Sequence, residues 1–273
     1  MPDAPLTQAS DAELALAVQG NLFALFRAMS ALSDFESHET PALCYHHAFP
    51  ANPMFKGVWQ TRLTPDTADA TIADTLAWFQ ARGAPFVFWW TGPGDEPANL
   101  PDRLQAHGFA PNIVGDPGMA LDLDTLAEPS RPPGLRIERA LDRRALEDWR
   151  DVFVAAYEIP PFVGQAWVDA TLSLGPAAAP WQMYVGYLDG EPVANTILFT
   201  GAGVASVYGV GTAPKARGRG VGGAITLQPL IDARTQGYRY AVLFATEMGH
   251  PVYRRLGFRD VGSTIGRYLW WGD

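Results

Sequence analysis

The chain has 273 residues, of which 48% are hydrophobic and 18% are charged, and its formal net charge is −9. This composition is typical of globular domains rather than disordered chains, and the acidic balance argues against a general nucleic-acid-binding surface. Cys44 is the only cysteine, which excludes an internal disulfide and fits a cytoplasmic location. The acidic N-terminus has no signal-peptide pattern, and no apolar run is long enough to span a membrane. The length favours two domains.

The first half of the chain predicts alternating strands and helices. A strand starts at Val58-Trp59 and ends near Thr64-Pro65. The segments that follow it are a helix over 68–82, a buried strand over 85–91, a helix over 100–106 and a short strand over 119–123. The aromatic run within 86–90 favours a core strand over a stacking platform.

The histidines and the cysteine show no spacing typical of a metal site. His46 and His47 are adjacent, so on a strand their rings would point to opposite faces of the sheet. We therefore expect no metal.

The clearest boundary lies at residues 124–133, where three prolines and mixed charges interrupt any periodic pattern. We place a linker at 125–134, between a first domain at 1–124 and a second at 135–273.

The second half predicts an antiparallel meander followed by a glycine-rich junction. An Asp189-Gly190 turn joins strands over 181–188 and 192–199, and a turn over 201–203 leads to a third strand over 204–210. Beyond the junction, the expected elements are a helix within 222–236, a strand over 239–246 and a short helix over 249–255.

The junction itself predicts an anion site. Its strand delivers a group of glycines to the start of a helix, where free backbone N–H groups and the helix dipole favour phosphate; these glycines are Gly218, Gly220, Gly222 and Gly223. Arg217 and Arg219 add positive charge beside those amides.

Several kinds of phosphate loop compete for this junction. A Walker A loop requires Gly-Lys-Ser/Thr, which Gly222-Gly223-Ala224 does not supply. The spacing Gly218-x-Gly220-x-x-Gly223 satisfies the dinucleotide fingerprint, with Glu247 near the position of a ribose-binding acid. The antiparallel meander and the 26 residues that follow Glu247 leave no room for a doubly wound sheet. A plain glycine-rich turn without a ligand is the remaining alternative.

Two blocks resemble the GNAT superfamily of acyl-CoA-dependent N-acyltransferases. Arg217-Gly218-Arg219-Gly220-Val221-Gly222 is similar to the family's Arg/Gln-x-x-Gly-x-Gly/Ala pyrophosphate loop. Residues 253–258, Tyr-Arg-Arg-Leu-Gly-Phe, resemble its Tyr-x-x-x-Gly-Phe element. The resemblance covers residues 135–271, and it implies an α/β (α+β) fold with a mixed, mostly antiparallel sheet flanked by helices.

The resemblance also implies roles for particular residues. The arm of acetyl-CoA would pair with the strand edge Val210-Gly211-Thr212, with the Val210 amide polarising the thioester carbonyl. The pyrophosphate would bind the loop, whose residues are Arg217, Gly218, Arg219, Gly220, Val221, Gly222 and Gly223. Tyr253 matches the family's general acid.

The general base is less well specified by the sequence. Glu247 lies at the end of a strand and is our candidate, although it could equally cap the following helix. His250 and Glu158 are the alternatives. Many members of the family carry an asparagine where this chain has ATEMG at 245–249, which leaves the contacts there open.

The first half resembles a degenerate second copy of the same fold. Three anchors recur at one constant offset: 58 against 207, 65 against 214, and 109 against 258. The segment of the first copy that corresponds to the phosphate loop, Asp66–Ala70, has two carboxylates and no glycine, and Leu104 replaces Tyr253. We therefore predict tandem GNAT-like domains with one cofactor site, in the C-terminal half, and we expect Trp270-Trp271 to pack the two halves together.

The predicted function is transfer of an acetyl group from acetyl-CoA to a primary amine of an unidentified small-molecule or peptide acceptor. The alternatives are a catalytically silent acyl-CoA-binding or regulatory module and, third, a dinucleotide-binding oxidoreductase. We expect no nucleic-acid or membrane partner, and a homodimer stays open.

Overall fold

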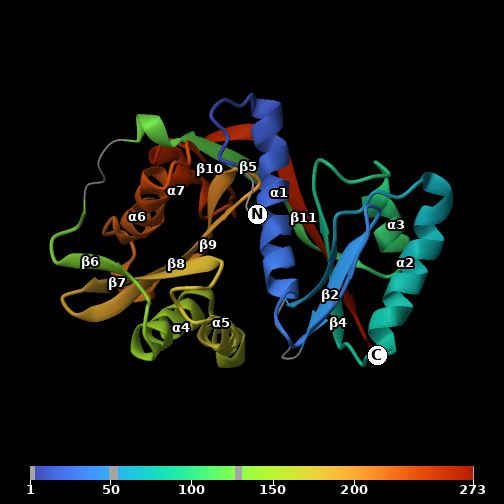
Figure 1. Ribbon diagram of the computed structural model, residues 1–273, viewed down its shortest axis with the longest axis horizontal. Coiled ribbons are helices and arrows are strands. Elements are labelled where there is room, and N and C mark those ends of the chain that lie inside the picture. Colours follow the sequence, from blue (N-terminus) through green and yellow to red (C-terminus); the bar gives the residue numbers. More distant parts are fainter. Residues whose placement is uncertain (1–3, 49–54, 127–130, 273) are drawn as a thin grey trace.

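The computed structural model describes residues 4–48, 55–126 and 131–272, and a single mixed sheet runs through both halves of the chain (Figure 1). The strands are β1 Phe35–Glu39, β2 Cys44–Ala48, β3 Lys56–Trp59, β4 Phe86–Thr91, β5 Ala110–Asp122, β6 Leu135–Arg139, β7 Trp181–Leu188, β8 Glu191–Gly201, β9 Val204–Thr212, β10 Tyr240–Phe244 and β11 Arg259–Trp271. The helices are α1 Asp11–Ser30, α2 Pro65–Gln80, α3 Leu100–Ala106, α4 Arg143–Tyr157, α5 Pro161–Leu174, α6 Val221–Thr235 and α7 His250–Arg255.

The order of the strands is nearly symmetric about its middle: β1-β2-β3-β4-β11-β5-β10-β9-β8-β7-β6. In each half, an antiparallel meander is followed by a helix, a strand parallel to the preceding one, a short helix and a long last strand. The last strands are exchanged, because β5 pairs with β10 and β11 pairs with β4. These two strands also pair with each other and join the halves into one sheet.

The internal repeat predicted from the sequence recurs in the bounds of these exchanged strands, at 110 against 259 and at 122 against 271. The predicted fold class is confirmed, with the two mostly antiparallel sheets joined edge to edge. The division at 1–124, 125–134 and 135–273 stays a prediction, and residues 127–130 of the predicted linker lie outside the described residues.

The helices cover the two faces of the sheet differently. Apolar residues of α1, α4 and α5 pack on one face, which we call the α1 face. On the opposite face, α6 and α7 pack on the C-terminal half, and α2 and α3 pack on the N-terminal half. Side chains alternate between these faces along each strand.

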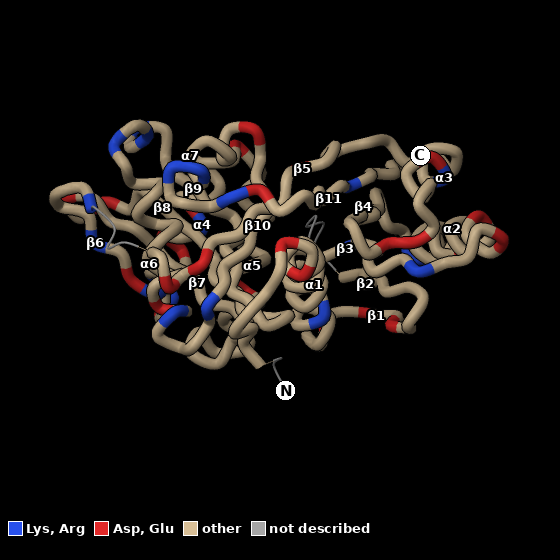
Figure 2. The backbone as a smooth tube through the Cα atoms, turned by 90° about the horizontal axis from the view of Figure 1, so that it is seen from above, with Lys and Arg blue, Asp and Glu red and all other residues tan. Residues whose placement is uncertain are grey.

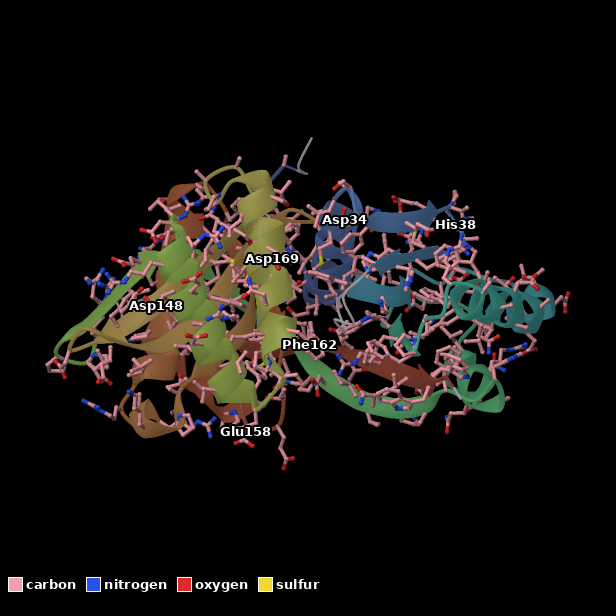
Figure 3. All side chains as sticks on the ribbon, turned by 90° about the horizontal axis from the view of Figure 1, so that it is seen from below. Asp34, His38, Asp148, Glu158, Phe162 and Asp169 are labelled. Carbon is pink, nitrogen blue, oxygen red and sulfur yellow. The ribbon has the colours of Figure 1, made fainter. Side chains whose placement is uncertain are left out.

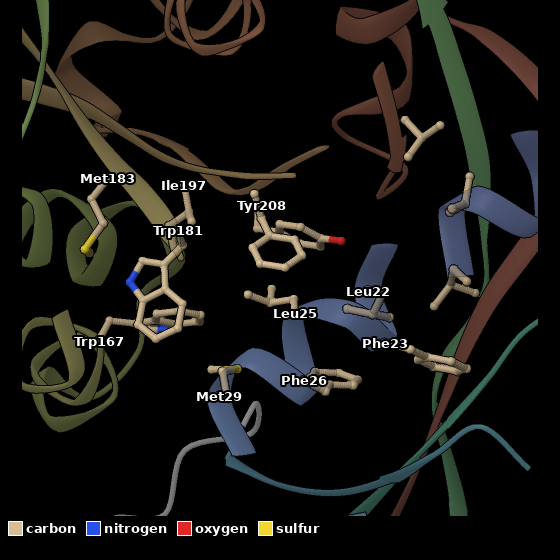
Figure 4. Packing of buried hydrophobic residues seen from close by; sticks show 14 of the residues in the cluster. Leu22, Phe23, Leu25, Phe26, Met29, Trp167, Trp181, Met183, Ile197 and Tyr208 are labelled. Atoms are coloured by element: carbon tan, nitrogen blue, oxygen red, sulfur yellow. The ribbon is translucent and has the colours of Figure 1, made fainter. Parts of the chain in front are cut away.

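Helix α1, which the sequence analysis did not identify, crosses the α1 face at the junction of the halves (Figure 1). It begins with a capping box, in which Glu13 N donates to Ser10 Oγ and Ser10 N donates to Glu13 Oε2. Its buried Asn21 donates to the carbonyl of Gly201 at 2.9 Å and accepts from the Tyr208 hydroxyl at 2.7 Å. Figure 4 shows the apolar side chains of α1 packed beside Tyr208 and the Trp167–Trp181 pair.

The predicted elements of the second half, 181–188, 192–199, 204–210, 222–236, 239–246 and 249–255, are present with small shifts at their ends. The first half differs more. The strand that starts at Val58 stops at Trp59, because Gln60 takes a positive φ of 55°, and the last strand extends from 119–123 to Ala110–Asp122.

Other details of the first half agree with the sequence. His46 packs against Phe26 of α1 and His47 against Phe79 of α2, on opposite faces of the sheet as predicted. Trp270 and Trp271 pair with β4 of the other half, as expected of residues that join the halves. Among the described residues, no helix is long and apolar enough to cross a membrane, and no three metal-ligating side chains gather at one point.

Candidate functional site

The β9–α6 junction has the backbone geometry of an anion cradle. Gly218 and Gly220 have φ values of +75° and +79°, and Gly220 is the N-cap residue of α6. The helical bonding starts with Ala224 N, which donates to Gly220 O at 3.1 Å. The N–H groups of residues 221–223 have no acceptor in the part of the chain that the structure describes. They are therefore available to an anionic ligand.

The space around the cradle is open on the ligand side. Among the described residues, a Cβ at Gly218 would meet nothing within 4 Å, and one at Gly220 would meet only Pro132, at 3.7 Å. Gly222 and Gly223 are tighter, with Thr212 Oγ1 at 3.3 Å and Leu256 Cδ2 at 3.2 Å from the corresponding positions. The first two glycines give the loop its shape, and the other two allow α6 to pack closely.

The two arginines of the loop are used differently. Arg217 donates through Nε to Thr212 O at 3.1 Å and through Nη2 to Ala156 O at 3.0 Å. It therefore ties the loop to the ends of β9 and α4. Arg219 is exposed and lines a shallow cavity of about 270 Å³ beside Asp189. It is the arginine with freedom to meet a phosphate.

Strands β9 and β10 separate next to the cradle. Their parallel pairing is confined to Ala205↔Ala241 and Ser206↔Val242, although β9 continues to Thr212. Residues 210–212 therefore have β8 on one side and no described strand on the other. This is the edge at which an extended ligand can bind as an added strand.

A bulge in β9 lies within this gap. Asn195 of β8 pairs with Gly211 and Ile197 pairs with Tyr208, so β9 has one extra residue between these pairs. The Asn195 amide donates to Gly209 O at 2.8 Å and holds the bulge. Its oxygen is buried and has no hydrogen-bond partner in the described ranges of the chain, and a Cβ on Gly211 would overlap that atom. The sequence analysis missed Asn195, because its role depends on a cross-strand register.

Tyr157 contacts the same bulge, and Tyr253 is a neighbour of Tyr157. The Tyr157 hydroxyl, at the end of α4, donates to Val210 O at 3.1 Å. Although 45% of Tyr157 is exposed, burial of its hydroxyl end and the neighbouring Tyr253 raise its pKa. Tyr253 of α7 is half-buried, and burial raises its pKa to about 12. Tyr157 was also missed, although it directly precedes the predicted candidate Glu158.

The candidate bases lie in different surroundings. Glu247 is exposed in the turn after β10, where it does not cap α7; Gly249 N donates to Thr246 Oγ1 instead, at 3.2 Å. The ring of His250 is bound to Asp260 at 2.7 Å. Glu158 is exposed and caps α4 with a φ of 53°. Glu247 lies at the open end of β10, and its side chain makes no hydrogen bond with the described residues, so it suits the role of a base best of the three.

The corresponding gap in the N-terminal half is filled by the chain itself. By the repeat offset, residues 61–63 match 210–212. Glu96 N donates to Thr61 O at 2.8 Å, and Leu63 N donates to Glu96 O at 3.1 Å, so the β4–α3 loop takes the place of an added strand. Asp95 anchors this loop by accepting from Thr61 N at 3.0 Å and Gly92 N at 2.8 Å.

The start of α2 is equally unsuited to a phosphate. Asp69 pairs with Arg103 and His107 of the segment that follows, and Leu104 is fully buried. Acidic residues gather on α2, whereas α7 of the C-terminal half carries arginines (Figure 2). These contacts favour a single cofactor site, in the C-terminal half.

Comparison with known proteins identifies the family that the second half resembles. The family model described as Acetyltransferase (GNAT) domain matches residues 139–261. A GCN5-related N-acetyltransferase from Kribbella flavida superposes with a TM-score of 0.73 at 18% identity, over 93% of this chain and 96% of that one. A tandem GNAT protein from the clavulanic acid biosynthesis pathway superposes with a TM-score of 0.62 at 14% identity, over 100% and 98%. At these identities, the superpositions establish the fold alone.

Two curated relatives match this chain over only part of their own length. A mycothiol acetyltransferase from Acidothermus cellulolyticus is 28% identical over 174 residues, which are 62% of this chain and 49% of that protein. Another, from Saccharomonospora viridis, is 39% identical over 75 residues, or 26% and 24% of the two chains. The chain thus spans about half the length of the first relative and a quarter of the second. Residues 139–261 therefore match an acetyltransferase domain of the GNAT family, within a chain that has the fold of a tandem GNAT protein.

Proposed function

We propose that the chain is an N-acetyltransferase that transfers an acetyl group from acetyl-CoA to a primary amine of a small molecule or peptide. The observation that carries this proposal is the convergence of three features: the open cradle at Gly218–Gly223, the separated edge at 210–212, and the hydroxyl-bearing Tyr253. The relatives' names state an acetyl transfer. Their acceptor is not carried over, because the chain matches only part of their length.

The pyrophosphate and the pantetheine arm of acetyl-CoA have matching groups on the protein. The amides of residues 221–223 and Arg219 suit the pyrophosphate, and the open edge of β9 suits the pantetheine arm. The bound thioester supplies the activated acetyl group. Arg217 contributes by fixing the loop to β9 and α4.

The residues of the chain then assist the displacement. The Val210 N–H polarises the thioester carbonyl, a carbon–nitrogen bond forms, and the carbon–sulfur bond breaks. Tyr253 keeps its proton because its pKa is about 12, so its hydroxyl can donate to the departing sulfur. An amine with a pKa near 10 is mostly protonated at pH 7, and Glu247 accepts its proton through water.

Thiol release in the presence of acetyl-CoA and a panel of primary amines tests this function. A thermal-shift assay first separates the cofactor classes: acetyl-CoA should raise the melting temperature far more than NAD or ATP at equal concentration. A ligand at a hundredfold excess over its Kd stabilises by about 2.7 kcal/mol. An equal shift with NAD would favour dinucleotide binding instead.

The cradle is tested by a matched pair of glycine substitutions at the two ends of α6. Gly220→Asp puts a carboxylate where the pyrophosphate would lie, so affinity for acetyl-CoA should fall at least about tenfold, or 1.4 kcal/mol. Gly237→Asp is the control, because Gly237 has a positive φ of 95° and open surroundings at the other end of the helix. Equal losses in both variants would point to general destabilisation rather than to the cradle.

A further inference from the structure

The exchanged strands bring an acidic and a basic residue onto the α1 face, beside the separated strands. Asp116 of β5 pairs with Ile265 of β11, which packs in the core of the α1 face. Arg267 pairs with Trp90 of β4, which belongs to the same core. Since paired residues in a sheet project to the same side, both charged side chains lie on the face opposite α6 and the phosphate loop.

Arg267 is held in one orientation by aromatic rings. Its guanidinium lies 4.5 Å from the ring centre of Phe88 and 5.0 Å from that of Trp90. Its Nε donates to Asn112 Oδ1 at 2.7 Å. Its terminal nitrogens have no hydrogen-bond partner among the described residues. Burial lowers its pKa to about 10, so the group stays charged at neutral pH and can bind an anion.

Asp116 lies directly beside the end of β10. The next residue, Pro117, accepts a hydrogen bond from Ala245 N at 3.0 Å. Burial raises the pKa of Asp116, and the positive charge of Arg267 acts in the opposite direction. Within the described chain the two side chains form no ion pair with each other. Each therefore keeps hydrogen-bonding capacity for a ligand.

The spacing of the strands relates this pair to the reaction site. Neighbouring strands lie about 4.8 Å apart, so Asp116 is one strand from β10 and Arg267 is two. Tyr208 of β9 and Phe244 of β10 project to the same face, with ring centres 6.3 Å apart. Figure 3 looks onto this face, where Glu158 and Phe162 mark the α4–α5 connection.

We infer that Asp116 and Arg267 bind the acceptor, Asp116 by accepting a hydrogen bond from its primary amine and Arg267 by binding an anionic group on the same molecule. This inference rests on the proposed acyl transfer and narrows its substrate class to amines that also carry a carboxylate or phosphate. The N-terminal half then has a direct part in the site, because β5 belongs to it and Trp90 orients the arginine.

Matched amines that differ only in the anionic group test this assignment. The probes are glycylglycine against glycylglycinamide, and 4-aminobutyrate against 4-aminobutanamide. The wild-type protein should favour the carboxylate of each pair by about tenfold or more in kcat/KM, as for a charge-assisted contact. Arg267→Gln should abolish that preference, and Asp116→Asn should raise KM for both members while leaving the affinity for acetyl-CoA unchanged.

Two variants outside the site serve as controls. Arg82, like Arg267, stacks on a tryptophan, 3.7 Å from the ring centre of Trp78, and Arg82→Gln is the control for Arg267→Gln. Asp74 is exposed, and Asp74→Asn is the control for Asp116→Asn. Neither should alter the preference or KM. Acetylation with equal use of both members of each pair would overturn this inference alone. Binding of acetyl-CoA without acetylation of any amine would overturn the proposed function, and this inference with it.

Discussion

Tyr157 and Tyr253 influence each other's surroundings near the bulge of β9, and their contacts suit different tasks. Tyr157 donates to Val210 O and so helps to hold the backbone of the bulge. Tyr253 has no described hydrogen bond from its hydroxyl, and its pKa of about 12 keeps it protonated throughout the working pH range. It can therefore act as a proton donor but not as the base.

Replacing Tyr253 with phenylalanine should separate catalysis from binding. Tyr253→Phe keeps the ring that packs against Phe258 at 5.8 Å, so stability and acetyl-CoA affinity should change little. The value of kcat should fall by roughly 10²-fold, because the lost proton transfer contributes only in the transition state. Steady-state kinetics and calorimetry measure both quantities, with Tyr238→Phe as a control. Full activity in Tyr253→Phe would identify water as the proton source.

At the scale of elements, each half has a gap between two parallel strands, and the gap is open in one half and filled in the other. In the C-terminal half, β9 and β10 leave an open edge next to a glycine cradle. In the N-terminal half, the β4–α3 loop closes the equivalent edge with backbone hydrogen bonds and a half-buried carboxyl group, that of Asp95. The same position of the repeat is thus open in one half and occupied by the chain itself in the other.

The stability of the closed loop should depend on pH through Asp95. Burial raises the pKa of Asp95 from 3.8 to about 7, against the effect of its two backbone donors. The folded state thus binds the proton more tightly, so this contribution is fully present below pH 4 and is lost as the pH rises through 7. At about 1.4 kcal/mol per pH unit, the loss is on the order of 4 kcal/mol.

Urea unfolding between pH 5 and pH 8 measures this contribution. In the wild type and in Asp74→Asn, the free energy of unfolding should decline as the pH rises. In Asp95→Asn, the part of this decline that is due to Asp95 should be absent. An Asp95→Asn variant with the wild-type pH dependence would mean that Asp95 is ionised throughout this range.

At the scale of the whole molecule, the exchange of β5 and β11 makes each half depend on the other. Without its partner, the segment 135–273 would leave β10 unpaired on the side now covered by β5, and 1–124 would leave β4 unpaired on the side covered by β11. Such exposed edges favour aggregation. Helix α1 adds contacts across the same junction, including the ion pair of Asp11 with Arg259 at 2.6 Å.

The two segments, expressed separately, are therefore expected to be unfolded or aggregated, and to form a folded complex when they are produced together. Circular dichroism and size-exclusion chromatography of each segment, and of the pair, check this. An isolated 135–273 segment that folds and binds acetyl-CoA would contradict it, since β5 would then be dispensable.

Much of the C-terminal half could be predicted from local signals. The turn at Asp189-Gly190 and the apolar runs around it predict the meander, because strand periodicity and turn chemistry are local properties. The glycines before α6 predict the cradle for the same reason. Helix α1 was missed, since residues from Leu14 to Met29 are buried on several sides and leave no clear polar stripe.

The sequence by itself determined the family resemblance, the glycine cradle with Tyr253, and the repeat with a degenerate first copy. The partners of the last strands were decided only by the tertiary structure. Strands β5 and β11 occupy equivalent positions in the repeat, and backbone hydrogen bonding does not distinguish a strand of the same half from one of the other. The position of Asp116 and Arg267 on the α1 face depends on that pairing. Residues far apart in the chain could thus be assigned to one site only once the register of the joined sheet was known.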